Sequence, residues 1–344
     1  MKHYASPNEI KVGVIGYGGA FNMGRQHLKE MQKAGMTPVA VAEPDETRRA
    51  VAAQEFPGIH AYASVTEMLA SGDIDLVTLI TPHNTHAPLG LECLQAGVSV
   101  VAEKPVTVTT AECDSLIAVA KEKDLVLSTY HNRHWDGCIL KALEVVKSGV
   151  LGDIVRVDAS MGTYAKPKDW WRTSKSISGG LLYDWGVHLL EYTFQIITSP
   201  IKEVSGYMKK GFWAQSSVWT TDTNEDDGFA LVRYESGQWS SLRISTLQAE
   251  FSPHWITITG TKGTHAFHSD RYRTSTFDEN SKALVVEGPN PEGEGWKFYQ
   301  NIADHLVKGE ALVITPEWSR RPIHVIEWTE KSSDAGKALP VQYA

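Results

Sequence analysis

The sequence predicts a two-domain α/β protein, in which an N-terminal, doubly wound parallel sheet is followed by an α/β domain with an open, mostly antiparallel sheet. In support, short apolar runs alternate with helical patterns six times before residue 130, as is typical of a parallel sheet. Longer strands with alternating polar and apolar residues, separated by glycine turns, follow residue 150. The length of 344 residues also suits two domains.

A glycine-rich turn follows the first predicted strand, residues 11–15, and leads into a helical pattern. This order is the setting of a dinucleotide-binding fingerprint, because glycines let the backbone approach a pyrophosphate that the helix N-terminus attracts. The spacing departs from G-x-G-x-x-G as though three residues were inserted, since the third glycine would fall at Phe21 and the next is Gly24. The turn residues expected to contact a cofactor are Gly16, Tyr17, Gly18, Gly19, Ala20, Phe21, Asn22 and Met23.

An acidic residue, Glu43, ends the second predicted strand, residues 38–42. Its separation from Gly18 suits the fingerprint once three inserted residues are allowed for. A carboxylate at this position accepts hydrogen bonds from the ribose hydroxyls and repels a 2′-phosphate. We therefore expect NAD as the cofactor and, because of Glu43, regard NADP as the less favoured one.

The strand at 76–80 ends in the sequence TPHNTH. Open α/β sheets bind their ligands at the carboxyl ends of the strands, so this loop is expected to contact the cofactor. The alternative is a loop whose histidines face solvent. The residues assigned to the cofactor here are Thr81, Pro82, His83 and His86.

The strand at 98–101 ends in Glu103, Lys104 and Pro105. Pro105 disfavours the helical conformation at Lys104, so the lysine is held extended at the strand end. A lysine fixed there is a candidate acid, base or hydrogen-bond donor, and Glu103 is assigned to the cofactor site with it. The alternative is a solvated Glu-Lys pair. With the strand at 125–129, the predicted parallel sheet has six strands, the number in a full dinucleotide-binding (Rossmann) fold.

A helix in the second half carries the other candidate catalytic groups. Asp184 and His188 are four residues apart, so their side chains share one face of this helix. A carboxylate can orient an imidazole and raise its basicity, which gives a general base near neutral pH. The alternative is an ordinary helical pair. Just upstream, Trp170, Trp171 and Arg172 supply flat apolar faces and a forked donor that suit a polyhydroxylated ring, or serve as core or interface residues.

Composition excludes several classes of function. The formal net charge of -8, without any run of lysines or arginines, argues against a nucleic-acid surface. No window approaches the apolar length of a membrane span, and we expect a cytoplasmic protein. Three widely spaced cysteines fit reduced structural thiols, and the histidine pairs lack the further ligands of a metal site, so no metal is expected. The open second sheet can bury its outer face only against another subunit, which predicts a homo-oligomer, a dimer or tetramer.

Together these residues resemble the Gfo/Idh/MocA family of oxidoreductases, over nearly the whole chain. The resemblance rests on the glycine turn, Glu43, TPHNTH, Glu103-Lys104-Pro105, Asn132-Arg133, the segment from Gly179 to His188, and the C-terminal IEWTEKSSDAG. The departures are the lengthened glycine turn and Glu43, where Asp is more usual in the family.

The resemblance implies a Rossmann domain that binds NAD or NADP, here placed at residues 1–130. A substrate-binding and oligomerisation domain would occupy residues 131–344, with room for the C-terminal segment to pack back on the first domain. It further implies hydride transfer between nicotinamide and a carbinol carbon of a sugar, glycoside or cyclitol. His188 would take the hydroxyl proton, Asp184 would position the ring or substrate, and Lys104 would hold and polarise the reacting oxygen. Further candidates are Asn132 for the cofactor and Arg133, Trp135, Trp171 and Arg172 for the substrate.

Two other functions remain open from the sequence. The first is a glycosidase or lyase that retains NAD, oxidises a ring carbon transiently and returns the hydride after elimination. The second is a cofactor-binding sensor without turnover. Lys104 and His188 together disfavour the sensor, since a sensor needs neither an acid nor a base.

Overall fold

The structure is a computed structural model that describes residues 2–18 and 22–341. The chain divides into two compact units. The first comprises Met1–Asn132 and Trp296–Arg320, and the second comprises Arg133–Gly295 and Arg321–Ala344. Among the described residues, no helix is long and apolar enough to cross a membrane.

The first unit contains a six-stranded sheet with the strand order β3-β2-β1-β4-β5-β6. All of its neighbouring strands are parallel, so their carboxyl ends lie along one edge, as expected for a doubly wound sheet. The central strands are buried along almost their whole length, which accounts for their continuous apolar sequence. The strands are β1 Lys11–Ile15, β2 Thr37–Ala42, β3 His60–Tyr62, β4 Leu76–Leu79, β5 Ser99–Ala102 and β6 Leu127–Thr129.

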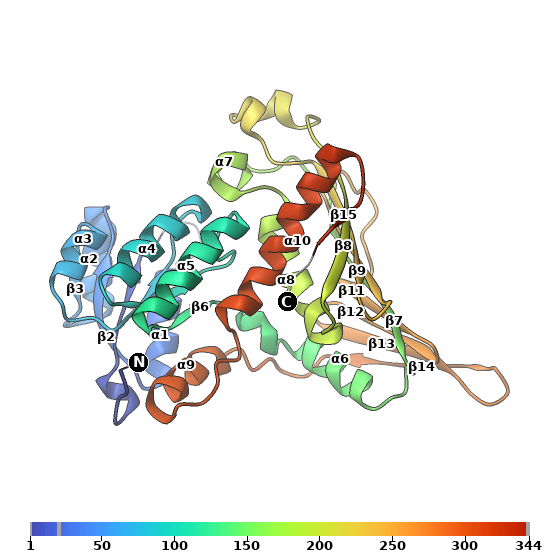
Figure 1. Ribbon diagram of the computed structural model, residues 1–344, viewed down its shortest axis with the longest axis horizontal. Helices are drawn as coiled ribbons and strands as arrows, with labels where there is room; N and C mark the ends of the chain where they lie inside the picture. The colour runs from blue at the N-terminus through green and yellow to red at the C-terminus, as the bar shows by residue number, and fades with distance from the viewer. Residues whose placement is uncertain (1, 19–21, 342–344) are drawn as a thin grey trace. The chain divides into compact units, whose positions relative to one another are not determined.

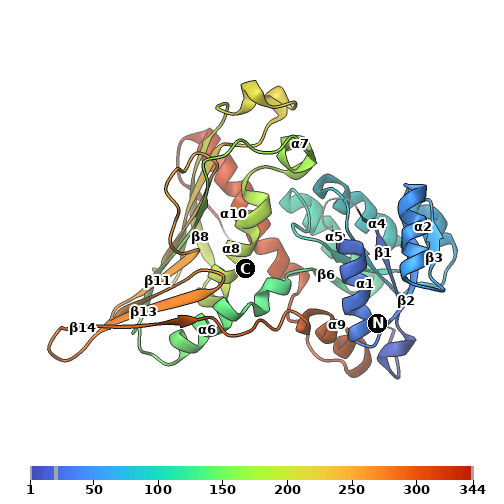
Figure 2. The same ribbon diagram turned by 180° about the vertical axis from the view of Figure 1, so that it is seen from behind.

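Helices cover both faces of this sheet. Figure 1 shows α4 and α5 over one face, and Figure 2 shows α1 on the opposite face. Side-chain caps start several of them: Asp45 accepts from the Arg48 amide, and Thr109 forms a capping box with Glu112. The helices are α1 Met23–Lys33, α2 Glu46–Glu55, α3 Val65–Ala70, α4 His86–Gln95, α5 Thr110–Lys123 and α9 Lys297–Lys308.

The second unit contains a nine-stranded sheet with the order β14-β13-β12-β11-β7-β10-β9-β8-β15. Its ladders are antiparallel except for the parallel pair β10 and β7, which confirms the predicted mostly antiparallel sheet. The strands are β7 Ile154–Gly162, β8 Ile201–Lys209, β9 Asp227–Tyr234, β10 Trp239–Ser245, β11 Ile256–Gly260, β12 Gly263–Phe267, β13 Arg271–Phe277, β14 Ala283–Pro289 and β15 Leu339–Pro340.

The helices of this unit gather on one face of the sheet, as Figures 1 and 2 both show for α8 and most of α10. A close approach brings α8 onto the sheet, because a Cβ on Gly186 would lie 3.3 Å from the Leu242 side chain. Figure 1 shows no helix over the other face within the described part of the unit, and Tyr207, on β8, is 66% exposed. The helices are α6 Gly137–Lys147, α7 Lys175–Ser178, α8 Leu182–Ile196 and α10 Pro316–Ala335.

The sequence did not predict β13, β14 or α9. Strand β14 is exposed at nearly every position, so its side chains carry no alternation that periodicity could detect. Helix α9 belongs to the first unit although it follows every strand of the second sheet except β15 in the sequence.

Candidate functional site

A pocket lies at the carboxyl edge of the first sheet. Its lining combines the ends of β1, β2 and β4 with the loops that follow them. The predicted residues in this lining are Gly16, Tyr17, Gly18, Glu43, Thr81 and Pro82. Residues that the sequence did not single out also line it, namely Arg48, Ser64, Val65, Thr85 and Leu89.

The glycine turn is shaped by close approaches between backbone segments. Gly16 has a φ of 95°, and a Cβ there would lie 2.5 Å from the Ile80 carbonyl oxygen. Gly24, in α1, would place a Cβ 2.9 Å from the carbonyl oxygen of Gly16. Gly24 therefore provides the close packing of helix on turn that the third glycine of the fingerprint provides, despite the irregular spacing. The predicted contacts Gly19, Ala20 and Phe21 lie outside the described residues. Asn22 is the N-cap residue of α1, and Met23 is its first residue.

Glu43 ends β2 and is 4% exposed. Its carboxylate accepts hydrogen bonds from the backbone N–H of Tyr17 at 2.7 Å and of Asp45 at 3.1 Å, which ties the glycine turn to the second strand. Arg48 packs against this turn, since a Cβ on Gly18 would lie 3.3 Å from its Cδ. A glycine cradle beside one carboxylate and one guanidinium fits the adenosine end of a nicotinamide dinucleotide.

Lys104 follows β5, and its backbone N–H donates to the carboxylate of Glu103 at 3.1 Å. The second oxygen of Glu103 lies 3.0 Å from Nε2 of His27, which is fully buried. Burial by itself would raise the pKa of Glu103, but the hydrogen bond with His27 and the charges of His27 and Lys104 outweigh it and lower that pKa. The Glu103 carboxylate that accepts from the backbone of Lys104 is therefore ionised.

The hydrogen bonding from Glu103 to His27 continues into the interior of the first unit. His27 Nδ1 lies 2.6 Å from the hydroxyl of Tyr299, which lies 2.9 Å from the hydroxyl of Thr78 on β4. Tyr299 belongs to α9, so a residue from the C-terminal part of the sequence completes the series of hydrogen bonds that starts at Glu103. Sequence reasoning missed His27 and Tyr299, because each sits in an ordinary amphipathic helix pattern.

The two histidines of TPHNTH are both buried. His86 has Nε2 at 2.9 Å from the Thr81 carbonyl oxygen and Nδ1 at 2.8 Å from the Pro105 carbonyl oxygen. It thereby joins the loop after β4 to the loop after β5. The structure does not place His83, His86, Glu103 or Lys104 in the lining of the pocket beside Glu43.

In the second unit, Asp184 lies in the first turn of α8. Its carboxylate accepts from the Arg172 guanidinium at 2.8 Å. That guanidinium also lies over two indole rings, 5.0 Å from the centre of Trp171 and 5.5 Å from that of Trp170. The structure thus brings the predicted residues Trp171, Arg172 and Asp184 together in one cluster.

His188 lies one turn further along α8 and is 6% exposed. Its ring centre is 5.6 Å from that of Trp185, and the Arg133 guanidinium lies 4.8 Å from the Trp185 ring. Arg133 is also paired with Asp136 at 2.9 Å. Trp135 is buried at the start of the same unit, and Asn132 is the last residue of the N-terminal segment of the first unit.

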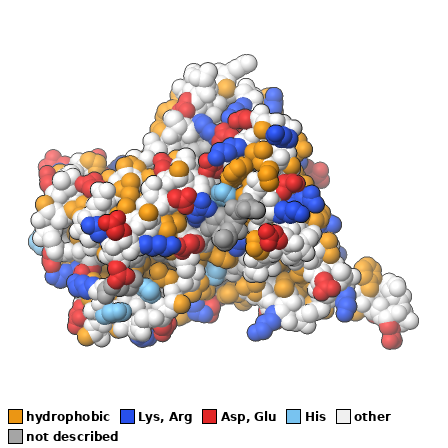
Figure 3. Space-filling view, in the orientation of Figure 1, with side chains coloured by type: hydrophobic (Ala, Val, Ile, Leu, Met, Phe, Trp, Pro, Cys, Tyr) orange, Lys and Arg blue, Asp and Glu red, His pale blue; other side chains and the backbone are white. Residues whose placement is uncertain are grey.

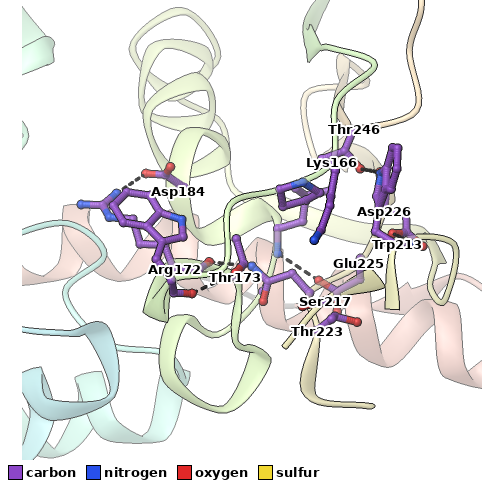
Figure 4. A pocket seen from close by; sticks show the side chains of 15 residues that line it. Lys166, Arg172, Thr173, Asp184, Trp213, Ser217, Thr223, Glu225, Asp226 and Thr246 are labelled. Atoms are coloured by element: carbon purple, nitrogen blue, oxygen red, sulfur yellow. Dashed lines mark hydrogen bonds and ion pairs between the residues drawn. The ribbon is translucent and has the colours of Figure 1, made fainter. Parts of the chain in front are cut away.

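A second pocket opens at the N-terminal end of α8 (Figure 4). Asp184 and Arg172 lie at one end of its lining, and Trp213, Asp226 and Thr246 lie at the other. Asp184 lines this pocket, whereas His188, among the described residues, does not.

Other features bear on the class of chemistry. Within residues 2–18 and 22–341, no cluster of three or more His, Cys, Asp or Glu side chains could hold a metal ion. The three cysteines are buried free thiols, and burial raises the pKa of Cys113 to about 12. Acidic and basic side chains are interspersed over the face seen in Figure 3.

Comparisons with known proteins agree with this architecture. A model described as "Oxidoreductase family, NAD-binding Rossmann fold" matches residues 10–131. A model described as "GFO/IDH/MocA C-terminal domain" matches residues 139–266. The two models belong to one family and together span most of the chain.

Named relatives include dehydrogenases of cyclitols. The chain is 24% identical to scyllo-inositol 2-dehydrogenase (NADP(+)) IolW of Bacillus subtilis, over 100% of this chain and 99% of that protein. It is 26% identical to myo-inositol 2-dehydrogenase of Thermotoga maritima, over 78% of this chain and 77% of that protein.

A solved structure of levoglucosan dehydrogenase in complex with NADH has the same fold, with a TM-score of 0.83, 18% identity, and coverage of 97% of this chain and 100% of that one. The expectation of an NAD(P)-dependent dehydrogenase is confirmed by these relatives and by the dinucleotide-binding domain. The chain belongs to the GFO/IDH/MocA family of oxidoreductases.

Proposed function

We propose that the protein is an NAD-dependent dehydrogenase that oxidises a carbinol carbon of a sugar, glycoside or cyclitol, or catalyses the reverse reduction. The observation that carries the proposal is Lys104, held at the carboxyl end of β5 by an ionised and partly buried Glu103. The relatives named above act on cyclitols or on levoglucosan, which supports a polyhydroxylated substrate.

The side chains divide the work as follows. Lys104 donates a hydrogen bond to the reacting oxygen and stabilises the negative charge that develops on it. His188 takes the hydroxyl proton during oxidation, while Asp184, oriented by Arg172, positions the substrate. A nicotinamide bound in the first unit would supply the acceptor for the hydride of the carbinol carbon. Arg133 and Trp171 are proposed to line the substrate, with Trp135 behind them.

We assign NAD as the preferred cofactor because Glu43 faces the pocket at the end of β2. A carboxylate there binds ribose hydroxyls and repels a 2′-phosphate. Arg48 lines the same pocket and is the cation that a 2′-phosphate would use, and IolW carries NADP in its name. The ratio of kcat/KM for NAD over NADP tests this: Glu43→Gln should lower it by about tenfold or more, and Arg48→Ala should raise it. A wild-type ratio below one would contradict the assignment.

The first unit is proposed to bind the dinucleotide, with Asn132 and the loop after β4 close to it, and the second to bind the substrate. The face of the second sheet that lacks helices is proposed to form a homo-oligomer, a dimer or tetramer. Exposed apolar side chains on the helix-free face of β13 and β14, such as Phe277 and Val285, support this. Light scattering that gives a monomer would contradict it. Buried free thiols support a reducing compartment, and we propose the cytoplasm.

The decisive experiment screens a panel of sugars, inositols and glycosides at a saturating concentration of NAD and follows the formation of NADH by absorbance. Lys104→Ala and His188→Ala should each abolish turnover and leave the Kd for NAD within a few fold. Unchanged turnover in both variants would overturn the proposal. Cleavage of a glycosidic bond without net NADH would instead identify an enzyme that retains its cofactor.

A further inference from the structure

The pocket at the N-terminal end of α8 leads away from the residue proposed to take the proton. Its lining begins at Asp184, in the first turn of α8, and reaches Trp213 and Thr246, which belong to other segments (Figure 4). His188 lies one turn further into the helix and does not contribute to the part of the lining that the structure describes. If the reacting carbon lies at His188, the pocket is left for another part of the substrate.

The far wall of this pocket is held rigidly. The indole N–H of Trp213 donates to the Thr246 hydroxyl at 3.1 Å. The backbone N–H groups of Phe212 and Trp213 donate to the carboxylate of buried Asp226 at 2.7 and 3.2 Å. One flat aromatic face is therefore fixed in place before any ligand binds.

The near wall is braced in the same way. The Trp170 carbonyl oxygen accepts from the indole N–H of Trp219 at 3.0 Å, and the Asn224 side chain donates to the Arg172 carbonyl oxygen at 2.8 Å. These bonds join the segment around residues 166–173 to the segment around residues 213–226. Trp170 lines the pocket together with Trp213. A ligand in this pocket contacts two tryptophans that are already ordered, so that binding costs little side-chain conformational entropy.

The charged side chains of the lining already have partners within the protein. Lys166 pairs with Asp169 at 3.2 Å, and Arg172 pairs with Asp184 at 2.8 Å. Glu225 has a fully buried side chain and pairs with Lys175 at 2.8 Å. A phosphate or carboxylate ligand would compete with Asp169 for Lys166 or with Asp184 for Arg172, whereas an uncharged ligand would not.

Fixed indole faces, surrounding hydroxyl and amide groups, and internally balanced charge select an uncharged ring with one apolar face and a rim of hydroxyls. The C–H groups of a pyranose form such a face. We propose that this pocket is a subsite for a second sugar ring, so that the substrate is an uncharged disaccharide or oligosaccharide whose first ring is oxidised. The inference rests on the proposed function, because it takes the reacting carbon to lie at His188.

The test compares kcat/KM for cellobiose, maltose, lactose and melibiose with that for glucose and galactose. The wild type should prefer at least one disaccharide to its monosaccharide by about tenfold or more. Trp213→Ala should remove that preference and change kcat/KM for the monosaccharide less than about threefold. Trp296→Ala, at an exposed indole of the first unit, is the control and should change neither. Trp213→Phe, which keeps an aromatic face, should retain part of the preference.

Calorimetric titration of the NAD-loaded protein with the same disaccharides separates the two proposals. Binding that depends on Trp213 without any NADH would overturn the dehydrogenase and keep the subsite. NADH from monosaccharides alone, with no effect of Trp213→Ala, would overturn the subsite and keep the dehydrogenase. A preference for sugar phosphates, or for aryl glycosides over disaccharides, would also overturn the subsite.

Discussion

The two pockets are built in different ways. The pocket beside Glu43 lies at the carboxyl ends of parallel strands, and its shape depends on backbone approaches such as that of Gly16 to Ile80. The pocket beside Asp184 is built from side chains of separate segments, held by hydrogen bonds such as that between Trp213 and Thr246. The first construction suits a cofactor that many relatives share, and the second can change with the substrate while the fold stays the same.

The largest effect should come from His188 on α8, the proposed general base. His188→Asn removes a base whose contribution to proton transfer is typically about 10²–10⁴-fold, so kcat should fall by that factor. The Kd for NAD, measured by fluorescence, should stay within a few fold. The control His60→Asn, on the exposed strand β3, should leave kcat unchanged. A wild-type kcat in the His188→Asn variant would show that His188 is not the general base.

Lys104 tests the first unit in the same assay. Lys104→Met keeps the length of the side chain and removes its donor, which should lower kcat by about 10²–10³-fold, the usual cost of losing one hydrogen bond to a developing oxyanion. Lys29→Met, at an exposed position of α1, is the matched control. A change confined to KM would show that Lys104 binds the ground state and transition state equally.

Gly16 tests whether backbone approach shapes the cofactor pocket. Gly16→Ala would combine a positive φ with a contact of 2.5 Å, and we expect it to lower the free energy of unfolding by about 2–4 kcal/mol and to weaken NAD binding. Gly97→Ala is the control, because its φ is 84° but its Cβ would meet nothing within 4 Å, so it should cost only about 1 kcal/mol. Equal losses in urea unfolding would mean that conformation alone, without close approach, explains Gly16.

The smallest effect concerns the charge balance of the second pocket. Burial would raise the pKa of Glu225, but the charge of and hydrogen bond with Lys175 outweigh it and hold that pKa below the ordinary 4.5. A lowered pKa contributes stability that is present above about pH 4.5 and is lost as the pH falls through the folded-state value.

Glu225→Gln should therefore lower the free energy of unfolding by about 1–3 kcal/mol at pH 7, and the difference from wild type should shrink below pH 4.5. Thermal or urea unfolding as a function of pH measures it. Glu235→Gln, at an exposed turn, should show no such difference. A difference that grows on acidification would contradict the assigned direction of the pKa.

The sequence predicted the sheet of the first unit and the loops at its carboxyl edge well, because each of their signals is local. A glycine turn, Glu43 and the Glu103-Lys104-Pro105 sequence each follow directly on an apolar strand, and parallel topology then brings their ends to one edge. For Arg172 and Asp184, the sequence indicated only that the two residues lie near each other in one segment, and not that they form an ion pair. Trp213 and Thr246 could not be predicted as site residues, because nothing in the sequence around either one indicates that both line the same pocket.

Helix α9 carries a consequence for the way the protein is made. Tyr299 supplies the hydroxyl that lies against the buried ring of His27, so the first unit is finished by a segment translated after Arg133–Gly295 of the second. A ribosome that has completed only residues 1–132 has made a sheet whose buried histidine still lacks that tyrosine. We expect the amino-terminal part of the chain to stay open to chaperones and proteases until translation is nearly over, and the second unit likewise to be completed only by its C-terminal segment, which carries most of α10 and strand β15.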